Sequence, residues 1–203
     1  YISKKYFGEM ITMLNDALFY DTYEIIGGEK FMSPAPRPSH SRVIGGIYNI
    51  ISTYLHRNKC GYAFTDNIDV YLPDGNIFRP DLVVVTKKNF SVVDWNKAIF
   101  GVPDMVAEVL SKSTMRRDFT VKKDIYEANG VKEYWIIDPR AKTVDVYILR
   151  DGKYALDESY FKYTAEEFEQ LDEEEKAAYK PEIKVGIFND LFIKVDDIFS
   201  WGY

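Results

Sequence analysis

The spacing of apolar side chains predicts a chain of alternating strands and helices. Apolar residues follow helical spacing over residues 4–20, 40–56 and 115–129, which predicts three helices. The third ends at Asn129-Gly130, where glycine supplies the left-handed conformation that commonly closes a helix. A further, strongly acidic helix is expected from Thr164.

Shorter apolar runs bounded by turn residues predict the strands. Three turns, Gly27-Gly28, Pro73–Asn76 and Asp138–Ala141, join neighbouring runs into antiparallel hairpins. Residues 86–103 show no regular pattern and are expected to form a loop at the domain edge. The expected strands span residues 23–26, 29–32, 62–71, 77–85, 105–110, 133–137, 143–149, 154–163, 183–185 and 191–195.

The order of these elements predicts the fold class. Hairpins followed by a strand, a helix and a strand indicate an α/β (α+β) fold, in which helices flank a mixed β-sheet. With 203 residues, 46% of them hydrophobic, and no strong break in composition, the chain is expected to form one domain. Its core would span about residues 20–150, and residues 151–203 would add the C-terminal strands and the acidic helix.

Cysteine usage and hydropathy indicate the compartment. The sequence contains one cysteine, Cys60, which excludes an intrachain disulfide and a cysteine-based zinc site. No apolar run approaches the ~18 residues that span a bilayer, and the amino terminus lacks a signal-peptide pattern. We therefore expect a cytoplasmic protein without a membrane partner.

The formal net charge of −6 argues against a nucleic-acid partner until its distribution is considered. Residues 164–178 hold seven acidic residues and one lysine, so the rest of the chain is neutral overall. Within that neutral part, residues 111–123 carry five basic residues and one acidic residue. Such a cluster is commonly a solvated helix face, and it is also what a phosphate backbone requires. The candidates for nucleic-acid contact are Lys112, Arg116 and Arg117.

Two carboxylates occur where hydrophobic strands ordinarily exclude charge. Asp81 follows Arg79-Pro80 and opens an apolar run, and Glu108 lies inside the run Met105–Leu110. An ionised carboxylate in such surroundings is costly unless a cation, a partner or a metal compensates it. Paired acids on adjacent strands suit Mg²⁺, a hard cation that prefers oxygen ligands. Together with a nearby lysine, they favour metal-assisted hydrolysis of a phosphodiester.

The helix over residues 115–129 supplies that lysine. Its stripe of apolar residues that should face the sheet comprises Met115, Phe119, Ile125 and Tyr126. Lys122 falls near the middle of this stripe, whereas Lys123 falls well off its centre. Lys122 should therefore project toward Asp81 and Glu108. Two structural alternatives are that Lys122 extends its amine to solvent, or that it forms a buried ion pair with Glu108 or Asp118.

With these residues, the sequence resembles the Uma-type family of restriction-endonuclease-like proteins, within the PD-(D/E)XK nuclease superfamily. The similarity covers about residues 20–150, with a weaker match to the end. In the parent superfamily the lysine follows the second acid by two residues, but that position here is Leu110. In the Uma-type branch the lysine has moved to the following helix, and Lys122 matches that place. The segments that carry the resemblance are Tyr23-Glu24, Gly28-Glu29, Met32–Pro36 with His40, Arg79–Leu82, Glu108–Ser111 with Ser113-Thr114, Arg117-Asp118 with Lys122 and Tyr126, and Gly130–Trp135.

The resemblance implies a restriction-endonuclease-like fold and an endonuclease that acts on DNA with Mg²⁺, or with Mn²⁺ in its place. It implies that Asp81 and Glu108 bind the metal, that the backbone carbonyl of Val109 is a further ligand, and that Lys122 serves the attacking water. Many nucleases of this fold act as dimers with one active site per strand, so a homodimer is a further expectation.

Two more residues are weaker candidates for the site. Glu29 would add a metal contact through water, and His40, at a helix start, would meet a phosphate or donate a proton. For His40, capping and turn packing are an equal alternative. Glu24 is expected to be a solvated strand residue. Two other functions stay open: a non-catalytic member of the fold that binds nucleic acid or a protein, and a nuclease that acts on RNA.

Overall fold

A computed structural model describes residues 23–32, 36–65, 68–111 and 115–199 of the chain. The helix expected over residues 4–20 lies outside these residues, and so does Lys112. Among the described residues, no helix combines the length and the apolar character needed to cross a membrane.

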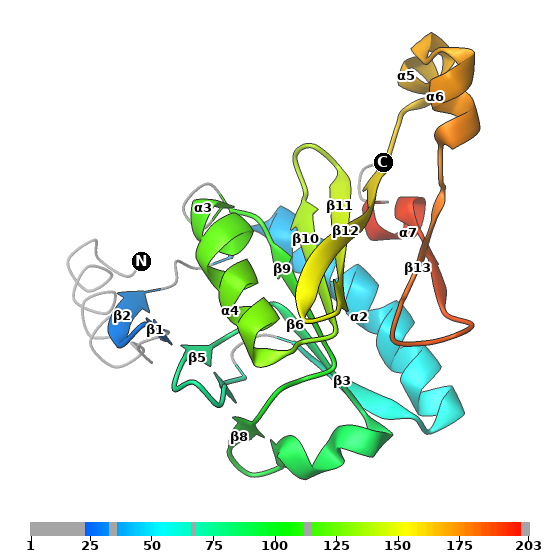
Figure 1. The fold of residues 1–203 in the computed structure, drawn as a ribbon. Helices are drawn as coiled ribbons and strands as arrows, with labels where there is room; N and C mark the ends of the chain where they lie inside the picture. The colour runs from blue at the N-terminus through cyan, green and yellow to red at the C-terminus, as the bar shows by residue number, and fades with distance from the viewer. Residues whose placement is uncertain (1–22, 33–35, 66–67, 112–114, 200–203) are drawn as a thin grey trace, which may run out of the picture.

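A mixed six-stranded sheet forms the centre of the fold (Figure 1). Strands β9 and β10 run parallel, and the other neighbouring pairs are antiparallel. The expected fold class is therefore confirmed. In spatial order the strands are β12 (Lys153–Phe161), β11 (Thr143–Arg150), β10 (Glu133–Asp138), β9 (Met105–Val109), β6 (Leu82–Thr86) and β3 (Gly61–Thr65).

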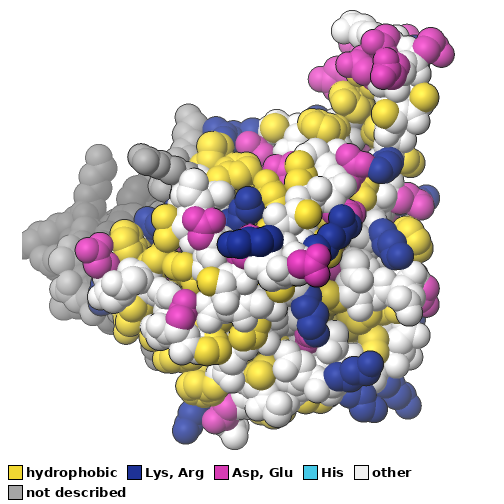
Figure 2. Space-filling model, viewed as in Figure 1, with side chains coloured by type: hydrophobic (Ala, Val, Ile, Leu, Met, Phe, Trp, Pro, Cys, Tyr) yellow, Lys and Arg dark blue, Asp and Glu magenta, His cyan; other side chains and the backbone are white. Residues whose placement is uncertain are grey.

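Beyond β12 the chain leaves the body of the molecule and forms an arm of two short helices (Figure 1). The single acidic helix expected from Thr164 is instead α5 (Ala165–Gln170) and α6 (Glu173–Ala178). Thr164 and Asp172 each begin a helix with a capping box, which satisfies two of the free amide groups at the start of the helix. A second capping signal inside the acidic stretch therefore divides the helix. Figure 2 shows the acidic side chains gathered on this arm.

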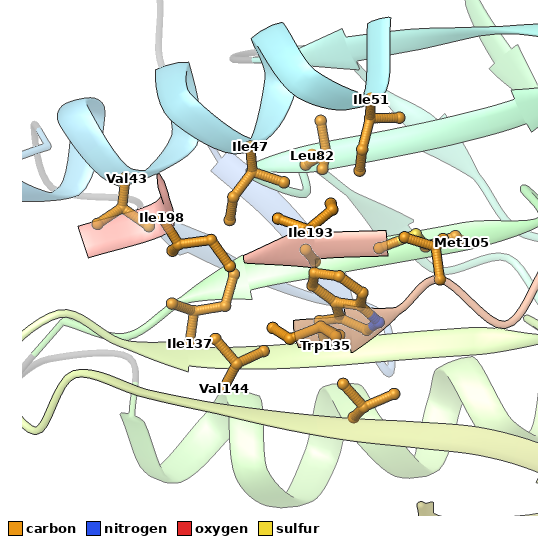
Figure 3. Close-up of a cluster of buried hydrophobic side chains, with 14 of the residues drawn as sticks. Val43, Ile47, Ile51, Leu82, Met105, Trp135, Ile137, Val144, Ile193 and Ile198 are labelled. Carbon is orange, nitrogen blue, oxygen red and sulfur yellow. The ribbon is translucent and has the colours of Figure 1, made fainter. Parts of the chain in front are cut away.

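One face of the central sheet is covered by α2 (Pro38–Asn58), which has proline at its first turn, and by the C-terminal elements. These are β13 (Glu182–Lys184), β14 (Phe192–Lys194) and α7 (Val195–Phe199). In Figure 3 the side chains of α2 point toward those of β6, β9, β10 and β14. The labelled members of this core are Val43, Ile47, Ile51, Leu82, Met105, Trp135, Ile137, Val144, Ile193 and Ile198.

The opposite face of the sheet packs against a second core. Strand residues alternate between the two faces, so that Val83, Val85 and Val106 point to the second core while Leu82 and Val84 point to the first. By the same alternation, Asp81 and Glu108 belong to the second face.

The helix that covers the second face contains a wider turn. It comprises α3 (Met115–Arg117), a π-helical turn (Asp118–Lys122) and α4 (Lys123–Asn129), and it ends at Gly130 with φ 85°, as expected. The π-turn changes the angular position of the residues that precede it. Phe119, expected on the sheet-facing stripe, is therefore 37% exposed, whereas Asp118 and Lys122 are buried.

A second six-stranded sheet lies beside the first, and three expectations are corrected there. The strands expected over residues 62–71 and 77–85 are each divided between the two sheets, the first as β3 and β4 (Val70–Tyr71) and the second as β6 and β5 (Ile77–Phe78). The expected loop over residues 86–103 contains a 3₁₀ helix (Lys87–Val92), β7 (Val93–Asp94) and β8 (Ala98–Phe100). The order of this sheet is β2 (Glu29–Met32), β1 (Tyr23–Ile26), β5 (Ile77–Phe78), β4, β8 and β7.

Candidate active site

Two neighbouring strands bring Asp81 and Glu108 together. Strands β6 and β9 are antiparallel, with Leu82 opposite Ala107, so Asp81 and Glu108 occupy the next position of the ladder. The backbone amide of Val109 donates to Oδ2 of Asp81 at 2.7 Å. The pair expected from the sequence therefore lies at one end of both strands.

Lys122 reaches this pair from the π-turn. Its Nζ lies 3.0 Å from Oε1 of Glu108 and 3.6 Å from Oδ1 of Asp118. The hydroxyl of Tyr126, one turn further along the helix, donates to the same Oε1 at 3.0 Å. Lys122 is only 3% exposed, so its amine is held in the interior and does not extend to solvent.

A third carboxylate, from Glu24, completes the cluster around Lys122. Oε1 of Glu24 lies 2.8 Å from Nζ of Lys122 and accepts from the backbone amide of Arg79 at 3.1 Å. Oε2 lies 3.8 Å from the guanidinium of Arg117. Glu24 is 2% exposed, so the expectation that it is a solvated strand residue is wrong. The sequence carried a signal for this burial. Side chains two residues apart along a strand point to the same face, so Glu24 lies on the same face as the buried Ile26.

Glu29, the expected fourth participant, lies elsewhere on the hairpin. It begins β2 directly after the Gly27-Gly28 turn and is exposed. The structure therefore brings Glu24, and not Glu29, to Lys122 from the first hairpin. Glu24 lies between Tyr23 and Ile25 in the sequence, whereas Glu29 lies between Gly28 and Lys30, and the hairpin buries only Glu24.

His40 approaches Asp81 from the opposite side. It lies in the first turn of α2, and its Nε2 is 3.0 Å from Oδ2 of Asp81. Oδ2 of Asp81 thus contacts both the imidazole of His40 and the backbone amide of Val109. The geometry makes His40 a residue that orients Asp81, a role that the sequence did not suggest.

Of the three candidates for nucleic-acid contact, Arg117 is the one whose side chain the structure describes. Arg117 lies over the ring of Phe31 at 4.5 Å and beside Glu24, so part of its charge is directed to the protein. Lys112 and the side chain of Arg116 lie outside the described part of the chain.

Burial and neighbouring charges together set the charge states within the cluster. Removal from water raises the pKa of Glu108 well above its usual range, and nearby carboxylates raise it further, while Lys122 opposes the shift. Burial lowers the pKa of Lys122, but Glu108, Glu24 and Asp118 outweigh burial and raise it. Lys122 therefore stays a cation at neutral pH, and Glu108 holds a proton more readily than an exposed carboxylate.

The oxygen atoms of Asp81 and Glu108 suit a hard cation. Within the described part of the chain, the contacts of Asp81 run through Oδ2 and those of Glu108 run through Oε1, which leaves one oxygen of each for another ligand. No three His, Cys, Asp or Glu side chains among the described residues form a metal cage. Mg²⁺ commonly binds one or two carboxylates together with water and substrate phosphates. The two carboxylates fit that requirement.

A mixed sheet whose neighbouring strands present two carboxylates to a helix-borne lysine defines a protein of the restriction-endonuclease-like class. The chain belongs to the Uma2 family, described as "Putative restriction endonuclease", whose model matches residues 20–177. The resemblance stated from the sequence is thus confirmed.

The fold is similar to that of a solved structure. It is described as a "putative nuclease belonging to DUF820" from Anabaena variabilis ATCC 29413. It is 21% identical to this chain with a TM-score of 0.66, and the match covers 89% of this chain and 91% of that one. A search of curated proteins found no match.

Proposed function

We propose that this protein is a metal-dependent endonuclease that hydrolyses phosphodiester bonds in DNA. The observation that carries the proposal is the meeting of Asp81 and Glu108 on neighbouring strands beside the buried amine of Lys122, 3.0 Å from Glu108. Membership of a family described as "Putative restriction endonuclease" supports the reaction class.

In this proposal Asp81, Glu108 and the carbonyl of Val109 hold Mg²⁺ or Mn²⁺, which neutralises charge that develops on the phosphate. Lys122 acts as a hydrogen-bond donor. Because its raised pKa keeps it charged at neutral pH, it orients the attacking water or the phosphate and does not accept a proton.

The remaining members of the cluster position these groups. Glu24 and Asp118 hold the amine of Lys122 between them, at 2.8 Å and 3.6 Å. His40 fixes the carboxylate of Asp81 through Oδ2. Such supporting partners keep reactive groups in a narrow range of positions, and their loss commonly costs 10- to 100-fold in metal affinity or activity, as an order of magnitude.

Cleavage assays test the proposal. The purified protein is incubated with single- and double-stranded DNA and RNA in Mg²⁺, Mn²⁺ or EDTA. We expect DNA cleavage with either metal and none with EDTA. Asp81→Asn should reduce the rate by more than ~100-fold, because it alters a ligand and not only a ligand's partner. Asp124→Asn, an exposed carboxylate on α4, is the matched control and should cleave like the parent.

Each other outcome bears on a different part of the proposal. Cleavage of RNA but not DNA would overturn the substrate, and cleavage in EDTA would overturn the metal. If no nucleic acid is cleaved under any of these conditions, the protein is a non-catalytic member of the fold.

A further inference from the structure

Four aromatic rings gather at the edge of the central sheet opposite to β12. Tyr62 and Phe64 belong to β3, and Phe90 and Trp95 follow β6. The ring centroid of Tyr62 lies 4.8 Å from that of Trp95 and 5.2 Å from that of Phe90. Tyr62 is 48% exposed and Trp95 is 60% exposed, so these rings present aromatic surface to solvent. We call these four residues the aromatic edge.

Basic residues flank the aromatic edge along the chain. Residues 56–64 and 86–97 lie side by side, since the amide of Lys87 donates to the carbonyl of Cys60 at 2.7 Å. The local charge of the two segments is +4, in a chain whose net charge is −6. Figure 2 shows basic side chains gathered at the lower right, over the end of α2 and the start of β3. The charged residues of the two segments are Arg57, Lys59, Lys87, Lys88 and Lys97, with Asp94 as the acidic member.

The aromatic edge and the candidate active site share one face of the sheet. In the ladder between β3 and β6, Tyr62 lies opposite Val85 and Phe64 lies opposite Val83. Residues directly opposite each other point to the same face, and residues two apart along a strand do so as well. Asp81, Val83 and Val85 therefore lie in one row, with the carboxylate at one end and Tyr62 beside the other, and the second core covers Val83 and Val85 between them.

We propose that the aromatic edge binds an unpaired stretch of the nucleic-acid strand on which the active site acts. This inference rests on the proposed function. Aromatic faces stack on any base, and lysines around them meet the phosphates, which is the combination found where proteins bind single strands without sequence preference. The same rings would have no base faces to stack on along an intact duplex, because its bases already stack on one another.

Binding of a fluorescently labelled oligonucleotide in EDTA tests the inference without cleavage. Trp95→Ala should weaken binding of single-stranded DNA by about 5- to 150-fold, the range expected for loss of one stacked base. Binding of the corresponding duplex should change by about twofold or less. Trp95→Phe retains a ring and should restore most of the single-strand affinity. Phe192→Ala removes a comparably exposed ring, 53% exposed on β14, and should leave binding unchanged.

The outcomes separate this inference from the function on which it rests. If the parent binds and cleaves nucleic acid but Trp95→Ala binds single strands equally well, the inference is overturned and the proposed function stands. If Trp95→Ala weakens single strands and duplex equally, stacking on unpaired bases is overturned. If Trp95→Ala changes the oligomeric state of the protein but not its binding of nucleic acid, the inference is also overturned, and the aromatic edge is an interface between copies of the chain. If the parent neither binds nor cleaves any nucleic acid, both proposals fail.

Discussion

Replacement of Lys122 by methionine should expose the electrostatic role of the buried cluster. Methionine keeps much of the length of the side chain but removes the ammonium that Glu24, Glu108 and Asp118 share, at 2.8, 3.0 and 3.6 Å. Removing one partner of a buried ion pair typically costs about 3 to 5 kcal/mol, because the remaining charge is uncompensated. For a chain of this size, 1 kcal/mol corresponds to roughly 2–4 °C in Tm, so Lys122→Met should melt about 6 to 20 °C below the parent.

Thermal melts with EDTA and with Mn²⁺ provide the assay. If a cation binds Asp81 and Glu108, it replaces part of the missing positive charge, and the upward shift of Tm in Mn²⁺ should be larger in Lys122→Met than in the parent. Lys123→Met is the matched control. Lys123 is half-buried and lies over the ring of Tyr147 at 4.4 Å, a contact worth about 1 kcal/mol or less.

Glu108→Gln is the complementary change. It removes one of three negative charges, and Lys122 keeps Glu24 and Asp118, so the metal-free variant should stay within about 1 kcal/mol of the parent. Its Tm should no longer rise with Mn²⁺.

The reasoning is refuted if Lys122→Met melts like the parent, because the amine then does not compensate the cluster. A parent protein whose Tm is indifferent to Mn²⁺ and Mg²⁺ would refute the metal site.

Three further predictions concern other residues. Glu24→Gln should lower the cleavage rate by about 10- to 100-fold because it releases Lys122, whereas Glu29→Gln on the same hairpin should cleave like the parent in the same assay. Asp104→Asn should cost about 1.5 to 3 kcal/mol at pH 7, measured by denaturant unfolding, because it weakens hydrogen bonds to a charged group that is 1% exposed. Burial raises the pKa of Asp104, but its hydrogen-bond partners outweigh burial and lower it. The stability it contributes is therefore present above the ordinary pKa of 3.8 and lost as the pH falls through the lower folded value, so the variant and the parent should converge in acid. Replacing Arg116 and Arg117 by Ala should weaken nucleic-acid binding and reduce its salt dependence by about one unit of slope per lost phosphate contact; an unchanged slope would remove this helix from the interface.

The local elements were largely readable from the sequence. The helical spacing over residues 40–56 falls inside α2, and the glycine that closes α4 lies where the sequence placed it. Buried carboxylates and a lysine at the centre of an apolar stripe are costly without partners, and this cost is what made Asp81, Glu108 and Lys122 conspicuous. The structure brings these three residues together.

The remaining features depend on contacts that no local pattern records. Glu24 is almost a hundred residues away from Lys122 in the chain, and its burial is decided by how the first hairpin docks. The π-turn inserts a wider turn into a helix that propensity describes as regular, so the exposure of Phe119 could not be read from a constant angular step. Residues 62–71 have strand character throughout. Their division between two sheets follows from the strands with which they pair.

The helical arm makes the molecule an electric dipole. Residues 164–178 carry a charge of −6, which equals the net charge of the whole chain, and they stand on a projection away from the body (Figures 1 and 2). A long polyanion that approaches the arm first is repelled, whereas one that approaches the opposite end meets the excess of basic residues near β3. The consequence is kinetic: the arm selects the direction of productive encounters, so its neutralisation should change the association rate and its salt dependence more than the strength of the final complex.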